Sequence, residues 1–298
     1  MTAGDDFAGW MRAVQATVER SLGAALPSSI DTTGALHEAM RYAVLGGGKR
    51  VRPLLVFAAG ELFDAPATSL ANAAAAVEMI HAYSLVHDDM PCMDDDALRR
   101  GKPTVHVQYN EATALLAGDA LQAQAFGMLA DDAHLDDQCK VAMLSLLARA
   151  SGAAGMCGGQ AIDLASVGLT LSLSQLERMH QLKTGALLRA SVLLGAVAGK
   201  PLSHTETAAL DTYSNAIGLA FQVVDDVLDA TADSIALGKT AGKDQADNKP
   251  TYVSILGLEP SRELTQKLRN DAHEALAPFG DKARRLRQLA DLIVQRKA

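Results

Sequence analysis

Residues 68–96 read TSLANAAAAVEMIHAYSLVHDDMPCMDDD, and this stretch decides the fold. From Leu70 to Val86 only Glu78 carries a formal charge, and alanine, a strong helix former, is the commonest residue. Pro91 lacks an N–H and disfavours helical geometry at the residue before it, so the helix has to end close to Asp89. The stretch therefore predicts a buried helix over 68–89 that runs into an acidic loop.

Helical periodicity extends over most of the chain. Of its 298 residues, 49% are hydrophobic and only 4% are aromatic, a balance that favours helices over strands. The breaks are short and rich in glycine and proline, so we predict one all-α domain over residues 1–298. A capping box of Ser174 and Glu177 is expected to begin one helix. The expected helices are 6–24, 33–46, 52–63, 68–89, 110–131, 136–154, 174–198, 205–230 and 261–296.

Charge and cysteine content exclude several classes of protein. The formal net charge of -8 argues against nucleic-acid binding, which needs a basic face. Three cysteines without a CxxC pair fit a reducing compartment. The first residues do not resemble a signal peptide, and no run of eighteen apolar residues lacks a charge. We therefore expect a cytoplasmic protein without a membrane-spanning helix.

The acidic loop places five aspartates close together. On an unbroken helix Asp88 and Asp94 would point in different directions, because six residues are not a whole number of turns. A short loop after the helix brings Asp94 back beside Asp88. A solvated acidic loop is the alternative, but this run follows a helix that should be buried.

A second acidic cluster lies in the helix expected at 205–230, directly after the largely apolar stretch Ile217–Val224. Asp225 and Asp229 are four residues apart and share a helix face. Buried carboxylates need a cation, and an all-oxygen ligand set suits Mg²⁺ rather than zinc or copper. A chance pair on a surface helix is the alternative.

Basic residues flank both acidic clusters. Lys49 and Arg52 follow the glycine turn Gly46–Gly48, and the motif GxxxxGK followed by Ser or Thr is absent there. Arg99 and Arg100 follow the first acidic cluster and could bind phosphate oxygens or only neutralise carboxylates. Lys183 lies within an apolar helix, where a lysine often only extends to water. Lys239 and Lys249 follow the second cluster.

These motifs together resemble the trans-isoprenyl diphosphate synthase family, in its bacterial farnesyl type. The string from His87 to Asp96, followed by Leu98–Thr104, is similar to the first aspartate-rich motif of that family. Phe221–Asp229 is similar to the second. The remaining matching strings are Gly47–Pro53, Glu78–His81, Gly158–Leu164, Lys183–Gly185 and Asp247–Tyr252.

The resemblance implies a fold, a reaction and a metal. It implies a single bundle of about ten or more helices around a deep central cavity, in which isopentenyl diphosphate condenses with dimethylallyl or geranyl diphosphate. Mg²⁺ would be held by Asp88, Asp94 and Asp225, supported by Asp89, Asp226 and Asp229. Three Mg²⁺ ions are expected with diphosphate bound, and Mn²⁺ is an alternative.

The resemblance also assigns the remaining site residues and a homodimer. Isopentenyl diphosphate would be bound by Lys49, Arg52, His81 and Arg100. The allylic diphosphate would be held by Arg99, Lys183, Thr184, Gln222, Lys239 and Lys249. Of these, Arg99, Lys183 and Lys239 would act in catalysis with Asp88, Asp89, Asp94, Asp225 and Asp226.

Product length is expected to depend on Tyr83 and Ser84. Tyr83 lies five residues before Asp88, about 7.5 Å deeper along the helix. In the family, bulk at this depth forms a floor that stops chain growth, and an aromatic residue followed by serine resembles the farnesyl type. Geranyl or geranylgeranyl diphosphate synthesis, and a non-catalytic diphosphate-binding subunit, are the alternatives. A terpene cyclase would usually carry a different second metal motif.

Overall fold

Helices make up nearly all of the regular structure in the computed structural model, which describes residues 6–28, 34–231 and 250–296. The all-α prediction is therefore confirmed. The chain divides into two units, which are described separately. The first comprises Met1–Leu147 with Leu194–Pro201, and the second comprises Ala148–Leu193 with Leu202–Ala298.

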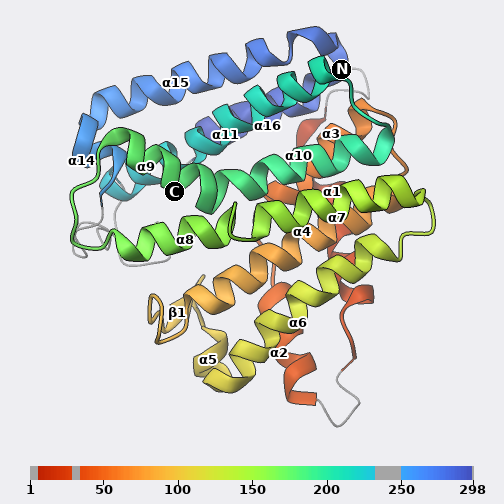
Figure 1. The fold of residues 1–298 in the computed structure, drawn as a ribbon, viewed down its shortest axis with the longest axis vertical. Coiled ribbons are helices and arrows are strands. Elements are labelled where there is room, and N and C mark those ends of the chain that lie inside the picture. Colours follow the sequence, from red (N-terminus) through yellow and green to blue (C-terminus); the bar gives the residue numbers. More distant parts are fainter. Residues whose placement is uncertain (1–5, 29–33, 232–249, 297–298) are drawn as a thin grey trace. The chain divides into compact units, whose positions relative to one another are not determined.

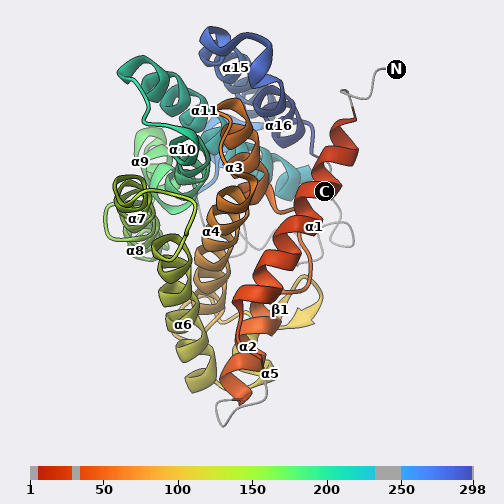
Figure 2. The ribbon, with the colours of Figure 1, turned by 90° about the vertical axis from the view of Figure 1, so that its right-hand side faces the viewer.

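The first unit is built around helix α4, which is buried along most of the stretch Ser69–Ile80 and lies among other helices of this unit (Figure 1). Ala73–Val77, Met79 and Ile80 are 0% exposed, because alanine lets neighbouring helices approach closely. Helix α6 packs along α4, and α1 packs on α3 and α4 (Figure 2). The elements of this unit are α1 (Phe7–Ala25), α2 (Gly34–Val44), α3 (Val51–Leu62), α4 (Ala67–Asp88), β1 (Leu98–Arg99), β2 (Lys102–Pro103), α5 (Val105–Gln108), α6 (Glu111–Ala130) and most of α7 (Asp137–Ser151).

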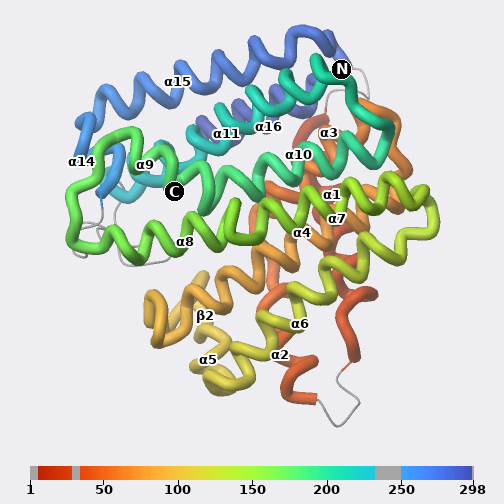
Figure 3. Tube along the Cα trace, viewed as in Figure 1, coloured from red at the N-terminus to blue at the C-terminus, as the bar shows by residue number. Residues whose placement is uncertain are grey.

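The second unit is built around the long helix α11, which packs along α15 (Figure 3). The buried Tyr213 of α11 donates a hydrogen bond to the carbonyl oxygen of Leu286 in α16 at 2.7 Å. The elements are α8 (Met156–Ala165), α9 (Leu173–His180), the π-helix η1 (Gln181–Gly185), the first part of α10 (Ala186–Gly199), α11 (His204–Thr231), α14 (Tyr252–Leu256), α15 (Leu258–Ala275), the 3₁₀ helix η2 (Ala277–Ala283) and α16 (Arg284–Val294).

Two helix boundaries differ from the sequence prediction. The expected helix at 136–154 ends at Ser151, and a separate, unpredicted helix α8 begins at Met156. The expected helix at 261–296 is two helices, because η2 contains Pro278 near its start and Gly280 with a φ of 56°. Apolar periodicity continues through this break, and periodicity alone therefore hid it.

The predicted capping box of Ser174 and Glu177 is wrong. The cap is Ser172, whose hydroxyl accepts from the N–H of Gln175 at 3.4 Å, while the Gln175 side chain accepts from the N–H of Ser172 at 2.9 Å. Glutamine serves in this motif as well as glutamate does, so the cap lies two residues earlier than predicted.

Two helical stretches, Asp137–Ala165 and Leu173–Gly199, have the length and hydropathy of a membrane span. Core helices share these properties, and 33% and 61% of the two apolar windows are buried. The first stretch is interrupted between Ser151 and Met156, and the second carries Lys183 and Arg189, each in an ion pair. The absence of a spanning helix stays a prediction.

Candidate active site

The first acidic cluster is a tight loop at the end of α4, which stops at Asp88 as Pro91 predicts. The N–H of Asp94 donates to the carbonyl oxygen of Asp88 at 2.8 Å, and the N–H of Asp96 donates to that of Asp89 at 3.2 Å. The predicted return of Asp94 to Asp88 is therefore confirmed for the backbone. Both side chains are half-buried, which leaves them partly accessible from outside.

Asp89 points inward and pairs with Arg99. The Nε of Arg99 donates to both carboxylate oxygens of Asp89 at 2.9 and 2.8 Å, and the Asp89 side chain is only 3% exposed. Burial lowers the pKa of Arg99, but the hydrogen bonds and charge of Asp89 outweigh burial and raise it above its ordinary value. Asp89 therefore orients Arg99 in this structure, a contact that the sequence analysis did not predict.

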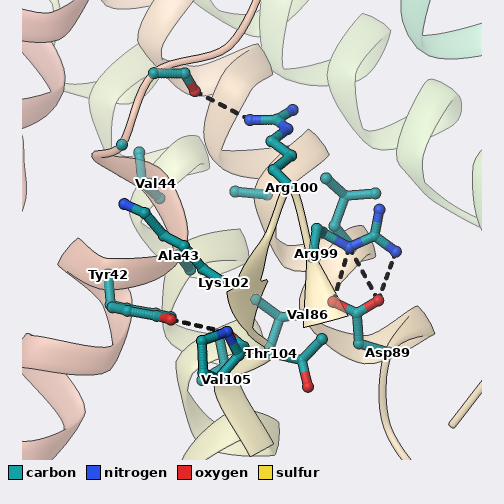
Figure 4. Close-up of a pocket in the computed structure, with 15 residues that line it drawn as sticks. Tyr42, Ala43, Val44, Val86, Asp89, Arg99, Arg100, Lys102, Thr104 and Val105 are labelled. Carbon is teal, nitrogen blue, oxygen red and sulfur yellow. Dashed lines mark hydrogen bonds and ion pairs between the residues drawn. The ribbon is translucent and has the colours of Figure 1, made fainter. Parts of the chain in front are cut away.

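A two-residue hairpin holds Arg99 and Arg100 in different directions. Strands β1 and β2 pair antiparallel, and the turn residues Arg100 and Gly101 have φ values of 53° and 76°. Arg100 extends to the glycine turn, where it donates to the carbonyl oxygen of Gly47 at 3.0 Å (Figure 4). All three glycines of that turn have positive φ, which other residues rarely adopt.

The four residues predicted to bind isopentenyl diphosphate all belong to the first unit, and three of them, His81, Arg52 and Arg100, lie close together. Burial lowers the pKa of His81 well below its ordinary value, and the neighbouring charges of Arg52 and Arg100 lower it further. Lys49 is exposed and Arg52 is half-buried at the start of α3. The arrangement is a group of cations around a histidine that stays neutral at pH 7.

Arg50, in the same basic stretch, is buried and has a structural role. Its guanidinium, 3% exposed, pairs with Glu19 and Glu78 at 2.6 Å each and donates to the carbonyl oxygen of Val44 at 2.7 Å. A buried cation requires such partners. Arg50 thus holds α1 and α4 against the start of α3.

A cavity of about 110 Å³ lies between α2, α4 and the hairpin (Figure 4). Apolar side chains, among them Val44 and Val86, line it from the two helices. Arg99, Arg100 and Lys102 line it from the hairpin. It therefore joins an apolar wall to a group of cations, which suits an amphiphilic anion.

Tyr83 and Ser84 lie five and four residues before Asp88 on α4. Tyr83 is 5% exposed, and its ring meets the His87 ring edge to face at 5.7 Å. Gly118 of α6 makes room for His87, since a Cβ there would lie 2.0 Å from the His87 Nε2. Ser84 donates to the carbonyl oxygen of His81 at 2.9 Å. Tyr83 is thus a fixed, buried side chain at the depth that the chain-length prediction requires.

In the second unit, Lys183 lies on the π-helix η1 and pairs with Asp163 of α8 at 2.6 Å. Gly159 permits this approach, because a Cβ there would lie 2.1 Å from the backbone nitrogen of Lys183. A π-helix turn re-aims side chains and occurs often at functional sites. Thr184, on the same turn, and Gln222 of α11 are half-buried.

Unsatisfied polar atoms lie close to this turn. The side-chain amide of Gln160, the Nδ1 of His180 and the hydroxyl of Tyr252 are buried without a hydrogen-bond partner among the described residues. His180 and Tyr252 lie against each other, with ring centroids 5.5 Å apart. Buried polar groups are nearly always satisfied, so water or a bound molecule has to complete their bonds.

The second acidic cluster lies on α11, and its three aspartates have different surroundings. Asp225 pairs with Arg296 at 3.0 Å and its side chain is 43% exposed. Asp226 is buried and accepts a hydrogen bond from the N–H of Tyr252 at 2.7 Å, so it holds the start of α14. Asp229 is half-buried, one turn after Asp225. Lys239 and Lys249 lie outside the described residues.

The carboxylates fit Mg²⁺ as the ion that they would hold. Among residues 6–28, 34–231 and 250–296, no group of three or more His, Cys, Asp or Glu side chains could hold a metal ion by itself. Zinc sites need three or four such ligands, whereas Mg²⁺ is usually held by one or two carboxylates together with waters and phosphate oxygens. The donor set here therefore suits Mg²⁺ bound with a phosphorylated substrate.

Two residues of this region were not assigned by sequence reasoning. Asp163 lies in one of the family motifs, but no role was predicted for it. Its position three residues after Gln160 places both side chains on one helix face, and this spacing is the signal that could have identified it. Arg296 had no local signal, because its partner Asp225 is far away in sequence.

Comparison with known proteins agrees with the resemblance described above. The family model described as Polyprenyl synthetase matches residues 33–283. The chain is 50% identical to the farnesyl diphosphate synthase of Escherichia coli over 264 residues, 87% of this chain and 88% of the other.

Two solved structures are similar over nearly the whole chain. An apo FPP/GFPP synthase from Zymomonas mobilis has a TM-score of 0.88 and 43% identity, over 97% of this chain and 99% of the other. A Helicobacter pylori geranyltransferase complexed with magnesium and isoprenyl diphosphate has a TM-score of 0.85 and 31% identity, over 99% and 98%. The prediction drawn from the sequence motifs is confirmed at the level of the family.

Proposed function

We propose that this chain, which belongs to the polyprenyl synthetase family, condenses isopentenyl diphosphate with dimethylallyl and geranyl diphosphates to give farnesyl diphosphate and diphosphate. The observation that carries the proposal is the group of cations around His81, next to the acidic loop of α4. Cations and carboxylates side by side suit a diphosphate that is bound both directly and through a metal ion.

Residues of the first unit bind isopentenyl diphosphate in this proposal. Lys49, Arg52 and Arg100 offer charge to its diphosphate, and the neutral His81 offers one hydrogen-bond donor. Arg50 keeps this surface in place through its buried ion pairs with Glu19 and Glu78.

The allylic diphosphate is assigned to Arg99, Lys183, Thr184, Gln222, Lys239 and Lys249 in this proposal. Arg99 is oriented by Asp89, and Lys183 is oriented by Asp163. Thr184 and Gln222 add polar groups, and Lys239 and Lys249 are assigned the same role by the family motifs alone. Fixed cations stabilise the negative charge that develops on the leaving diphosphate.

Mg²⁺ would be held by Asp88, Asp94 and Asp225 together with the substrate, and Asp89 and Asp229 would support these ligands. We propose that three ions bind with the diphosphate. Mn²⁺ is proposed as a substitute for Mg²⁺. When bound, the metal neutralises the diphosphate and makes it a better leaving group. Asp226 contributes through the backbone of Tyr252 instead. A relative solved with magnesium and isoprenyl diphosphate supports the choice of metal.

The reaction needs no covalent intermediate with the enzyme. The allylic C–O bond breaks and its electron pair leaves with the diphosphate. The double bond of isopentenyl diphosphate supplies the electrons of the new C–C bond, and a proton is then lost from the adjacent carbon to the released diphosphate. The residues of the chain bind and orient the two substrates, and they keep water away from the allylic cation.

Identification of the reaction product tests the proposal. The purified chain is incubated with dimethylallyl and isopentenyl diphosphates and Mg²⁺, and the prenyl products are identified by chain length. The proposal predicts farnesyl diphosphate, and none after EDTA is added. A geranyl or geranylgeranyl product would support the proposed condensation but contradict farnesyl diphosphate as its product. No condensation at all would favour a non-catalytic subunit.

We also propose that the chain works as one domain and as a homodimer in the cytoplasm. Leu115 and Leu116 of α6, 47% and 55% exposed, support an interface on the first unit.

A further inference from the structure

Arg296, just after α16, contacts Asp225 and Phe221 of the second aspartate-rich motif. Its Nη2 lies 3.0 Å from the Oδ1 of Asp225 and donates to the carbonyl oxygen of Phe221 at 3.0 Å. Its guanidinium carbon lies 3.9 Å from the centre of the Phe221 ring, within the range of a cation–π contact. Its Nε donates to the carbonyl oxygen of Ile293 at 3.2 Å.

The exposures show which partner of this ion pair is fixed. The Arg296 side chain is only 8% exposed and is held by four contacts, whereas the Asp225 side chain is 43% exposed. An exposed carboxylate on a helix would otherwise sample several rotamers in water. Arg296 is therefore the rigid group, and Asp225 is the group that it orients.

We propose that Arg296 is a positioning residue for the magnesium site: it holds Asp225 in the orientation that binds the metal and the diphosphate. The inference rests on the proposed role of Asp225 as a magnesium ligand. A carboxylate that binds a metal through one oxygen is commonly held by a hydrogen bond at the other, and loss of such a partner weakens metal binding by roughly 10- to 100-fold.

Lysine cannot replace Arg296 in this arrangement. A lysine ammonium is a point charge, whereas the planar guanidinium stacks on Phe221 and contacts both the Phe221 carbonyl and Asp225. Arg296→Lys should therefore bind Mg²⁺ more weakly than the wild type and more tightly than Arg296→Met.

Calorimetric titration of the full chain with MgCl₂, in saturating inorganic pyrophosphate, measures the effect without turnover. Arg296→Met is expected to weaken the apparent affinity for Mg²⁺ by about 10-fold or more. Methionine fills much of the same volume and so limits growth of the adjoining cavity, of about 370 Å³. Arg262→Met is the matched control, because Arg262 lines the same cavity but pairs with Glu259. The affinity of this variant for Mg²⁺ should equal that of the wild type.

The outcomes separate this inference from the proposed function. One outcome would show that Arg296 has no positioning role. In it, the wild type binds Mg²⁺ and Asp225→Asn does not, but Arg296→Met binds Mg²⁺ as tightly as the wild type does. Tighter binding by Arg296→Met would also overturn the inference, since the arginine would then compete with the metal. If Asp225→Asn binds as the wild type does, the role of Asp225 fails and the inference with it. Should Arg296→Met not fold, Phe221→Leu, which removes only the stacking, is expected to weaken binding to a smaller extent, and an unchanged affinity would overturn the inference.

Discussion

Tyr83 is the residue to which the product length is assigned. It is buried on α4 and packs against His87, and we propose that it forms the floor at which the growing prenyl chain stops. Replacing it by alanine removes this floor, so Tyr83→Ala should shift the main product from farnesyl to geranylgeranyl diphosphate or longer. Product analysis checks this, with Tyr109→Ala as the control, because Tyr109 packs on Tyr42 elsewhere in the first unit. An unchanged farnesyl product from Tyr83→Ala would move the floor to other residues.

His180 gives the stability of the protein a predicted pH dependence. Burial lowers its pKa to about 4, an effect that Asp163 opposes and Lys183 reinforces, whereas an unfolded histidine titrates near 6.5. Between these values the unfolded chain binds more protons than the folded chain, so stability is full above pH 6.5 and falls as the pH drops toward 4. The loss is about 3 kcal/mol.

Urea unfolding of the wild type and of His180→Phe, at several pH values between 7 and 4, measures this contribution. The variant should lose less stability on acidification than the wild type does. Equal losses in the two proteins would show that His180 does not titrate as its burial requires.

At the scale of elements, the contact between α4 and α6 depends on Gly118. A side chain there would meet the His87 ring, which is held by Tyr83 and by the carbonyl oxygen of Leu115. Gly118→Ala should therefore destabilise the fold by about 1–3 kcal/mol. Gly127→Ala, on the same helix with no atom within 4 Å of its Cβ, should stabilise it by up to about 1 kcal/mol. Urea unfolding measures the free energy of unfolding of both variants. A change in the same direction for both would contradict this packing.

Elements with strong local signals were predictable from sequence. The apolar run before Pro91 predicted the end of α4, and the acidic loop returns Asp94 to Asp88 as expected. The glycine turn before Lys49 was recognised from its composition, and its three positive φ values agree.

Features that depend on long-range contacts were not predictable. Lys49, Arg50 and Arg52 look alike in sequence, and only the packing of Glu19 and Glu78 shows that Arg50 is the structural one. Asp225 and Asp226 are neighbours, but one meets Arg296 and the other meets the backbone of Tyr252. A single sequence carries no signal for such pairs, because each partner is distant along the chain.

For the whole molecule we predict a homodimer. Leu115 and Leu116 expose apolar surface on α6, which water disfavours and a second copy could cover. Sedimentation equilibrium should give twice the 31.2 kDa chain mass. Leu116→Glu should shift the protein toward monomer, whereas Leu169→Glu, at an exposed leucine of the second unit, should not. A monomer mass for the wild type would contradict the prediction.

The central claim is that both acidic clusters serve one magnesium-dependent condensation. The most direct measurement is farnesyl diphosphate formation by Asp88→Asn and Asp225→Asn, with Asp95→Asn as the control. Asp95 is exposed in the same acidic loop with a φ of 50°, a conformation that asparagine tolerates. The account predicts that Asp88→Asn and Asp225→Asn each lose about 100-fold or more of turnover, while Asp95→Asn keeps most of it. Wild-type turnover in either Asp88→Asn or Asp225→Asn would contradict the claim.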